Sequence, residues 1–307
     1  MGRRDLALLA VPLVAAGGVG AWFYDSFLRR RVLPVGRDTY VVTGGGGNSL
    51  AVKRDGEVFL VDTKFGPGAT SLKCWIADEL GGPVTTILNT HYHYDHTQGN
   101  PLYPDADIWA HEGVPGLMRA RDGEWWRTRE RGIPTRLIGD GGRDDVVAHT
   151  EVVIRHPGTA HTHADLYAYL PEAELVATGD LLFHTYYPFF DTGPGGAAVP
   201  PLAGAVRTLA DEHPDAVFVP GHGPLATATD LRHYADYLER LYEVAEGVTA
   251  ARMSRAEGLR SIRQASSHLS ILPSFHGSRL SWATPGSNLG GCCQLVRSAA
   301  AGSTMGR

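Results

Sequence analysis

Four potential metal ligands lie within six consecutive residues of this chain. The segment reads His-Tyr-His-Tyr-Asp-His, and it comes shortly after Val84–Leu88, an apolar and β-branched run that predicts a buried strand. In an extended stretch His91 and His93 project to the same side and can bind one ion together. A turn into a helix would aim Asp95 and His96 at a second point nearby. Imidazole and carboxylate ligands without a thiolate suit Zn, Mn or Fe.

Single histidines elsewhere carry much less information. A lone residue such as His184, His213 or His233 is typical of an ordinary surface or core position. The cluster is different, because histidines and carboxylates packed together repel one another or stay unsatisfied unless a cation joins them. Loops at strand ends are also where α/β scaffolds place their sites. The cluster therefore predicts a metal site.

The motif His-x-His-x-Asp-His at a strand end resembles the signature of the metallo-β-lactamase superfamily. Further segments resemble the family's other motifs, in the family's order, and the whole resemblance covers about residues 38–248. These segments are Gly-Thr-Ala-His-Thr around His161, Ala-Thr-Gly-Asp ending at Asp180, and Val-Pro-Gly-His-Gly-Pro around His222. His163, two residues after His161, is an alternative ligand in the first of them.

The resemblance implies an α/β (α+β) fold, the αββα sandwich, with two metal ions. Three histidines hold the first ion, a carboxylate and two histidines hold the second, and an aspartate bridges them: His91, His93 and His161; Asp95, His96 and His222; and Asp180. The expected cofactors are two Zn²⁺ ions per chain, with Fe or Mn as alternatives. Asp95 and Asp180 are the carboxylates expected to take part in catalysis.

This ligand set predicts a hydrolase. Seven ligands on two ions leave a shared position for water, and two cations generate hydroxide near neutral pH. The resemblance implies attack of that bridging hydroxide on an ester, thioester, lactone or phosphodiester. The bridging Asp180 resembles the glyoxalase-II-like branch more than many zinc β-lactamases. Glyoxalase II also has a C-terminal helical domain that binds glutathione, whereas this chain continues with one long helix and a tail.

Other functions remain open at this stage. One alternative is an oxidoreductase similar to the persulfide dioxygenases, with a single iron on a subset of the ligands. A zinc β-lactamase and a metal-bound binding module without activity are two more. The complete ligand set favours two metals and hydrolysis.

Supporting residues are predicted around the ligands. Asp62 ends the run Leu-Val-Asp-Thr, where it either orients the ligand loop or only caps a turn. Tyr186, Tyr187 and Asp191 follow the bridging aspartate and either line the pocket or pack in the fold.

Alternating patterns and turn residues predict strands followed by helices. The predicted strands are 39–42, 48–52, 58–61, 84–88, 107–110, 151–154, 166–170, 175–177 and 216–219. The predicted helices are 69–80, 202–209 and 227–248, and residues 113–132 are expected to form a helix or lid near the surface. This order predicts two β-rich halves covered by helices.

Composition limits the partners. The net charge of the 307 residues is −5, which favours a small-molecule substrate and argues against nucleic acid. Three cysteines, two of them adjacent, do not make a disulfide framework. Cys74 is predicted to be a small core residue.

The two ends differ from the middle of the chain. Residues 1–32 contain a basic start and the apolar run Leu6–Phe23, typical of an export signal or a membrane anchor, so an extracytoplasmic (periplasmic) location is expected. Residues 33–250 are the predicted catalytic domain. Residues 251–307, rich in Ser, Gly and Arg, predict a poorly ordered tail or the product of a shifted reading frame.

Overall fold

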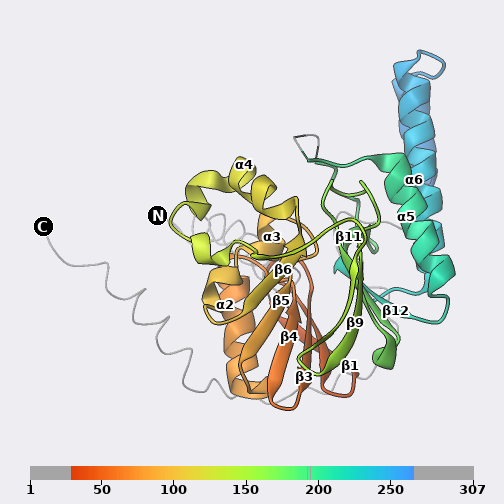
Figure 1. Ribbon diagram of the computed structural model, residues 1–307. Helices are drawn as coiled ribbons and strands as arrows, with labels where there is room; N and C mark the ends of the chain where they lie inside the picture. The colour runs from red at the N-terminus through yellow and green to blue at the C-terminus, as the bar shows by residue number, and fades with distance from the viewer. Residues whose placement is uncertain (1–28, 192, 194, 266–307) are drawn as a thin grey trace, which may run out of the picture.

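Two β-sheets packed face to face, each covered by helices on its outer side, form a four-layered αββα sandwich (Figure 1). The computed structural model describes residues 29–191, 193 and 195–265. This architecture confirms the fold predicted from the sequence.

The first sheet has seven strands in the order of the chain. They are β1 (Arg31–Gly36), β2 (Thr39–Thr43), β3 (Ser49–Arg54), β4 (Glu57–Val61), β5 (Val84–Leu88), β6 (Asp107–His111) and β7 (Arg136–Ile138). The strands from β1 to β4 pair antiparallel through short turns, and those from β4 to β7 pair parallel through helical crossovers. Parallel strands need such crossovers because the chain must return to the end of the sheet at which the previous strand began.

The second sheet has five strands in the spatial order β12-β11-β10-β9-β8. They are β8 (Arg143–Val147), β9 (Thr150–Arg155), β10 (Tyr167–Leu170), β11 (Leu175–Phe183) and β12 (Val217–His222). The pair β11 and β12 is parallel, and the other pairs are antiparallel.

Helices cover both outer faces. They are α2 (Gly66–Trp75), α3 (Tyr94–Thr97), α4 (Val114–Trp126), α5 (Val199–Glu212), α6 (Ala228–Thr249) and α7 (Arg255–Ala265). Short helical turns lie at Ile76–Leu80 (π), Asn100–Leu102, Glu130–Gly132 and Pro171–Ala173 (3₁₀). Thr227 begins α6 with a capping box, in which its hydroxyl accepts from the backbone of Asp230 and the Asp230 carboxylate accepts in return.

The apolar side chains form separate cores between the layers. Between the sheets, Val41, Phe59 and Leu88 face Ile154 and Val219, and all five are buried. Another core joins the second sheet to α5 and α6, and a further one joins the first sheet to α2. Burial at about 25 cal/mol per Å² of apolar surface makes these cores the main stabilising contribution.

The predicted strands are all present, and three further strands were missed: β1, β7 and β8. The helix predicted at 69–80 begins earlier, at Gly66, and its last turn, Ile76–Leu80, is a π-helix. The strand predicted at 175–177 continues to Phe183, so Asp180 lies inside β11 and not at its end. Gly179 has φ +52°, and the register with β12 shifts on either side of it, which turns the Asp180 side chain toward the site.

The segment 113–132 was expected near the surface, and this is correct only in part. It forms α4 and a 3₁₀ turn, and Trp126 at the end of α4 is fully buried. The indole packs with Tyr92 and Met118 in a fourth apolar cluster beneath α4. The helix therefore fixes the loop that carries His91 and His93.

The predicted end segments fall partly outside the described residues. The chain from Arg31 already belongs to β1, and the apolar run Leu6–Phe23 precedes the described part. Within that part, no helix is both long and apolar enough to cross a membrane. In the predicted tail, Arg255–Ala265 forms α7, which Arg240 of α6 contacts through Ser261 at 2.7 Å. Cys74 is buried, as predicted.

Candidate metal centre

The ligand motif occupies the loop between β5 and α3. Leu88 ends β5, and the loop that follows presents His91 and His93 before the chain turns into α3, which carries Asp95 and His96. The turn into α3 separates the two pairs of ligands, as predicted, but the stretch before it is bent at residues 90–92 and is not a regular extended chain. His161 comes from the loop between β9 and β10, Asp180 from β11 and His222 from the end of β12.

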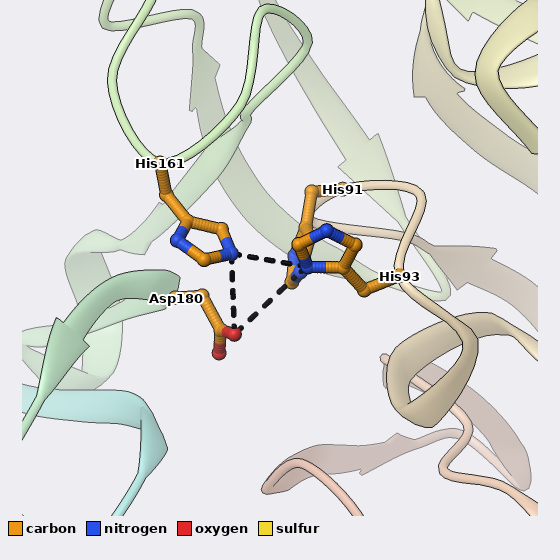
Figure 2. Close-up of side chains that lie close together, drawn as sticks. All are labelled: His91, His93, His161 and Asp180. Carbon is orange, nitrogen blue, oxygen red and sulfur yellow. Dashed lines mark hydrogen bonds and ion pairs between the residues drawn. The ribbon is translucent and has the colours of Figure 1, made fainter. Parts of the chain in front are cut away.

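Three imidazoles and one carboxylate converge in the first cluster (Figure 2). Nδ1 of His93 lies 3.0 Å from Nε2 of His91 and 3.1 Å from Nε2 of His161. Oδ2 of Asp180 lies 3.4 Å from Nε2 of His161 and 3.7 Å from Nε2 of His91. Each of the four side chains thus aims one ligand atom at the same point.

The second cluster contains Asp95, His96 and His222. Nε2 of His222 lies 3.2 Å from Oδ2 of Asp95 and 3.4 Å from Oδ1 of Asp180. Nε2 of His96 lies 3.2 Å from the same Oδ1. The two oxygens of Asp180 therefore face different clusters, which is the arrangement of a bridging carboxylate.

The donor atoms fit metal ions. Nε2 of His96 and Oδ1 of Asp180 are buried and have no hydrogen-bond partner among the described residues. Orphaned buried atoms of this kind are costly, and a cation between them satisfies both. Nitrogens about 3 Å apart are also the separation that Zn–N bonds of about 2.0–2.1 Å produce around one ion.

Electrostatics divide the histidines into two groups. Burial lowers the pKa of His161 to about 4 and holds that of His91 well below its usual value, so both are neutral and ready to bind a metal. Burial also opposes charge on His96 and His222. At these two histidines the negative charges of Asp180 and Asp95 outweigh the effect of burial. They raise the pKa of His222 to about 9 and that of His96 well above its usual value. In the metal-free protein, protons thus balance the carboxylates of the second cluster.

This difference predicts a pH dependence. A metal ion must displace the proton of His222, whose pKa of about 9 lies above the ordinary 6.5. We expect zinc affinity at the second cluster to rise between pH 6.5 and 9, by up to about tenfold per unit for each proton released. Zinc titrations at several pH values, with proton release measured in parallel, test this. Constant affinity with no proton release would contradict it.

Asp62 orients the ligand loop, which decides between the two interpretations of this residue. Its Oδ2 accepts from Thr90 Oγ1 and lies 2.7 Å from Nδ1 of His96, while its Oδ1 accepts from the Thr90 backbone at 2.8 Å. The contact with Nδ1 fixes the His96 tautomer and directs Nε2 into the cluster.

Asp191 plays the same part for the first cluster. This buried carboxylate lies 3.3 Å from Nε2 of His93, so that Nδ1 of His93 points at the other ligands. Tyr92 donates to it, and Arg121 forms an ion pair with it at 2.9 Å. Hydrogen bonds from Tyr92 and Gly193 outweigh the effect of burial and lower the pKa of Asp191 to about 2. Its sequence position indicated only a pocket-lining or packing residue.

Sequence reasoning missed Lys64 and Asn48. Lys64 is buried, and its ammonium donates to the Gly47 carbonyl at 2.6 Å. Burial lowers its pKa to about 7, against the opposing effect of Asp62 and Asp95. Asn48 donates to the carbonyls of Pro220 and Gly223, both at 2.9 Å, and so holds the His222 segment. In the sequence Asn48 only began the predicted strand 48–52, which indicated no such contacts.

The remaining candidates are His163, Tyr186 and Tyr187. His163 is exposed and belongs to neither cluster of the described chain, so His161 is the histidine brought to the site. Tyr186 packs partly buried against the core of the second sheet, and Tyr187 is 38% exposed.

Gly47 leaves space for the imidazole of His96, one of the metal-ligand side chains. A Cβ at this position would overlap the imidazole of His96. We expect Gly47→Ala to displace that ring, to lower zinc affinity at the second cluster and to destabilise the protein by about 1–3 kcal/mol. Gly204→Ala is the control, since a Cβ there meets nothing within 4 Å. Equal zinc affinity in the two variants would contradict the placement of His96.

Comparison with known proteins agrees with this geometry. A sequence profile of the Metallo-beta-lactamase superfamily matches residues 42–222, which is more than half of the chain and reaches the last histidine of the site. The chain belongs to the metallo-β-lactamase superfamily. Superfamily membership and the four convergent segments confirm the family predicted from the ligand motifs.

Two curated relatives carry the names of different enzymes. Over 157 residues the chain is 30% identical to the 2,4-dinitroanisole O-demethylase subunit alpha of Nocardioides sp. (strain JS1661), covering 49% of this chain and 45% of the relative. Over 143 residues it is 31% identical to a hydroxyacylglutathione hydrolase of Rhodospirillum rubrum, covering 44% and 51%. The chain thus spans about half the length of the curated relatives it matches. The second of them supports the glyoxalase-II-like resemblance.

Solved structures share the fold. A metallo-beta-lactamase from Pontibacter korlensis superposes with a TM-score of 0.56 at 20% identity, over 69% of this chain and 99% of that one. At this identity the similarity concerns the architecture and not the substrate.

Proposed function

We propose that this superfamily member is a dinuclear metal-dependent hydrolase of esters, thioesters, lactones or phosphodiesters. The observation that carries the proposal is the orientation of Asp180, whose Oδ1 faces His96 and His222 and whose Oδ2 faces His91 and His161. A carboxylate so placed can bridge two ions, and Zn²⁺ suits the imidazole-rich donor set, with Fe or Mn as alternatives.

The protein residues have separate tasks in this proposal. His91, His93 and His161 would hold the first ion, and Asp95, His96 and His222 the second. Bound ions would supply a Lewis acid and acidify a water molecule at neutral pH. Asp62 and Asp191 keep the ligand imidazoles in the required orientation through their hydrogen bonds.

Aromatic side chains near the clusters favour a substrate with an apolar acyl or aryl group. Phe189 is 60% exposed, and its ring centroid lies 6.1 Å from that of His93. Tyr94, next to Asp95, is 49% exposed and packs edge-on against Phe65. Exposed aromatic groups beside a polar centre are typical of a binding surface for an apolar group. The names of the two curated relatives, a 2,4-dinitroanisole O-demethylase subunit and a hydroxyacylglutathione hydrolase, are compatible with such substrates.

Hydrolysis assays on the full chain test the proposal. The protein is stripped with a chelator, reloaded with Zn²⁺, and offered aryl esters, acyl thioesters, lactones and phosphodiesters. We expect turnover of at least one class that disappears on stripping and returns on reloading, with aryl or long-chain acyl groups preferred. A β-lactam is assayed to test the zinc β-lactamase alternative. A persulfide is assayed, with oxygen uptake recorded, to test the dioxygenase alternative. Turnover of the persulfide by an iron-loaded protein, with no hydrolysis, would contradict the proposal.

A further inference from the structure

A third group of metal-ligand side chains lies outside the centre described above. His111 ends β6, Asp140 lies between β7 and β8, and His156 directly follows β9. One ligand atom from each of these three residues lies within 4.8 Å of the others. We propose that they bind a third divalent transition-metal ion, of the Zn²⁺ type, with a structural role.

His156 is oriented as a ligand. Its Nδ1 lies 2.8 Å from the backbone carbonyl of Asp165 and donates to it. A hydrogen bond at Nδ1 leaves the lone pair on Nε2, as in most metal-binding histidines. Nε2 lies 3.7 Å from Oδ1 of Asp140, which is too far for a hydrogen bond and suits two ligands that share an ion.

His111 and Asp140 complete the group. Nε2 of the buried His111 lies 2.9 Å from Oδ1 of Asp140, and its ring stacks on that of His156 with centroids 4.3 Å apart. The hydrogen bond from His111 holds the pKa of Asp140 below its usual value, so this carboxylate is ionised. Two imidazoles and one carboxylate are protein ligands that zinc takes, and a water molecule would fill the fourth position of a tetrahedral site.

Binding requires a tautomer change in His111. The Gly113 backbone N–H lies 3.2 Å from Nδ1 of His111 and donates to it, so Nε2 carries the proton. A metal ion on Nε2 moves that proton to Nδ1 and opens the Gly113 contact. The change leaves the Gly113 N–H and the new Nδ1–H facing each other without an acceptor, a cost that the metal–nitrogen bond must offset.

The location indicates a structural role. His111 belongs to the first sheet, His156 follows a strand of the second, and Asp140 lies in the segment that joins them. His156 and Asp165 also close the loop that carries His161, and the Asp165 side chain accepts from Thr162 within it. An ion here would join the two sheets at the base of that loop.

Zinc titration of the full chain tests the site. Metal-free protein is titrated with Zn²⁺ against a chromophoric chelator, in the wild type and in Asp140→Asn and His156→Gln. Asp140 is exposed, so its variant is expected to fold normally. We expect the wild type to bind one more equivalent of zinc than either variant, with a dissociation constant below roughly 100 μM.

Matched controls are Asp144→Asn and His149→Gln, two exposed residues outside the proposed ligand group, whose ion-pair partners are Arg155 and Asp55. Both controls are expected to bind as much zinc as the wild type. Anomalous diffraction from zinc-soaked crystals should show a peak between His111, Asp140 and His156. Equal stoichiometry in wild type and variants, weaker binding than that limit, or no peak there would overturn the proposal. None of these outcomes depends on metal at the Asp180 centre, so failure of either proposal is recognised separately.

Discussion

Asp180→Ala is expected to lose at least one equivalent of zinc and to reduce hydrolytic activity by about 10³-fold or more. The two oxygens of this carboxylate face the two clusters, so its removal takes a ligand from both. Two-metal catalysis contributes several kcal/mol of transition-state stabilisation, and about 1.4 kcal/mol corresponds to each factor of ten in rate. Zinc content by elemental analysis and kcat/KM for the best substrate of the assays measure both effects.

The matched control is Asp215→Ala, which removes an exposed carboxylate remote from the ligand loop. It should retain the zinc content and the activity of the wild type. Circular dichroism on both variants separates loss of metal from loss of fold. An Asp180→Ala protein that keeps its zinc and its activity would show that this aspartate does not bridge.

Asp62→Asn should lower zinc affinity by about 10–100-fold, the usual effect of removing a carboxylate that orients a ligating histidine. The amide keeps the size of the side chain and tolerates the backbone of residue 62, which has φ +58°. It cannot accept all the hydrogen bonds that Asp62 accepts from Thr90 and His96. We also expect a loss of about 1–3 kcal/mol in the free energy of unfolding, because buried donors lose an acceptor. Zinc competition and urea unfolding measure the two effects.

Asp38→Asn serves as the control, since Asp38 also has a positive φ, of 45°, but is exposed. Any general effect of an Asp-to-Asn change in a left-handed turn appears in both variants. If Asp62→Asn and Asp38→Asn bind zinc equally well, Asp62 has no part in orienting His96.

The site was predictable where its signal is local or carried by a motif. The motif from His91 to His96 lies within one short segment, and the predicted turn into a helix at Asp95 and His96 is present as α3. Lys64 and Asn48 could not be found in this way, because their partners are 17 and 172 positions away in the chain. The Asn48 contact exists only when the first sheet packs beside β12, and the Lys64 contact only when the loops before β3 and after β4 come together.

The strands, like the site residues, were predictable where their signal is local and were missed where it is not. Strands with a buried face, such as β4 and β5, carry an apolar pattern that burial itself requires. The missed strand β8 reads Arg-Asp-Asp-Val-Val, and it lies at the edge of its sheet, where exposed charged side chains are tolerated. The missed β7 has three residues, too few for a periodic pattern. Position at the sheet edge explains why β8 was missed, and length explains why β7 was missed.

The most direct test of a dinuclear centre is anomalous diffraction at the zinc edge from crystals of the zinc-loaded protein. We predict two peaks on opposite sides of the Asp180 carboxylate, one among His91, His93 and His161 and the other beside Asp95, His96 and His222, about 3.5–4 Å apart as in other two-metal sites. One peak, or none, at these ligands in a folded and zinc-saturated protein would contradict the dinuclear account.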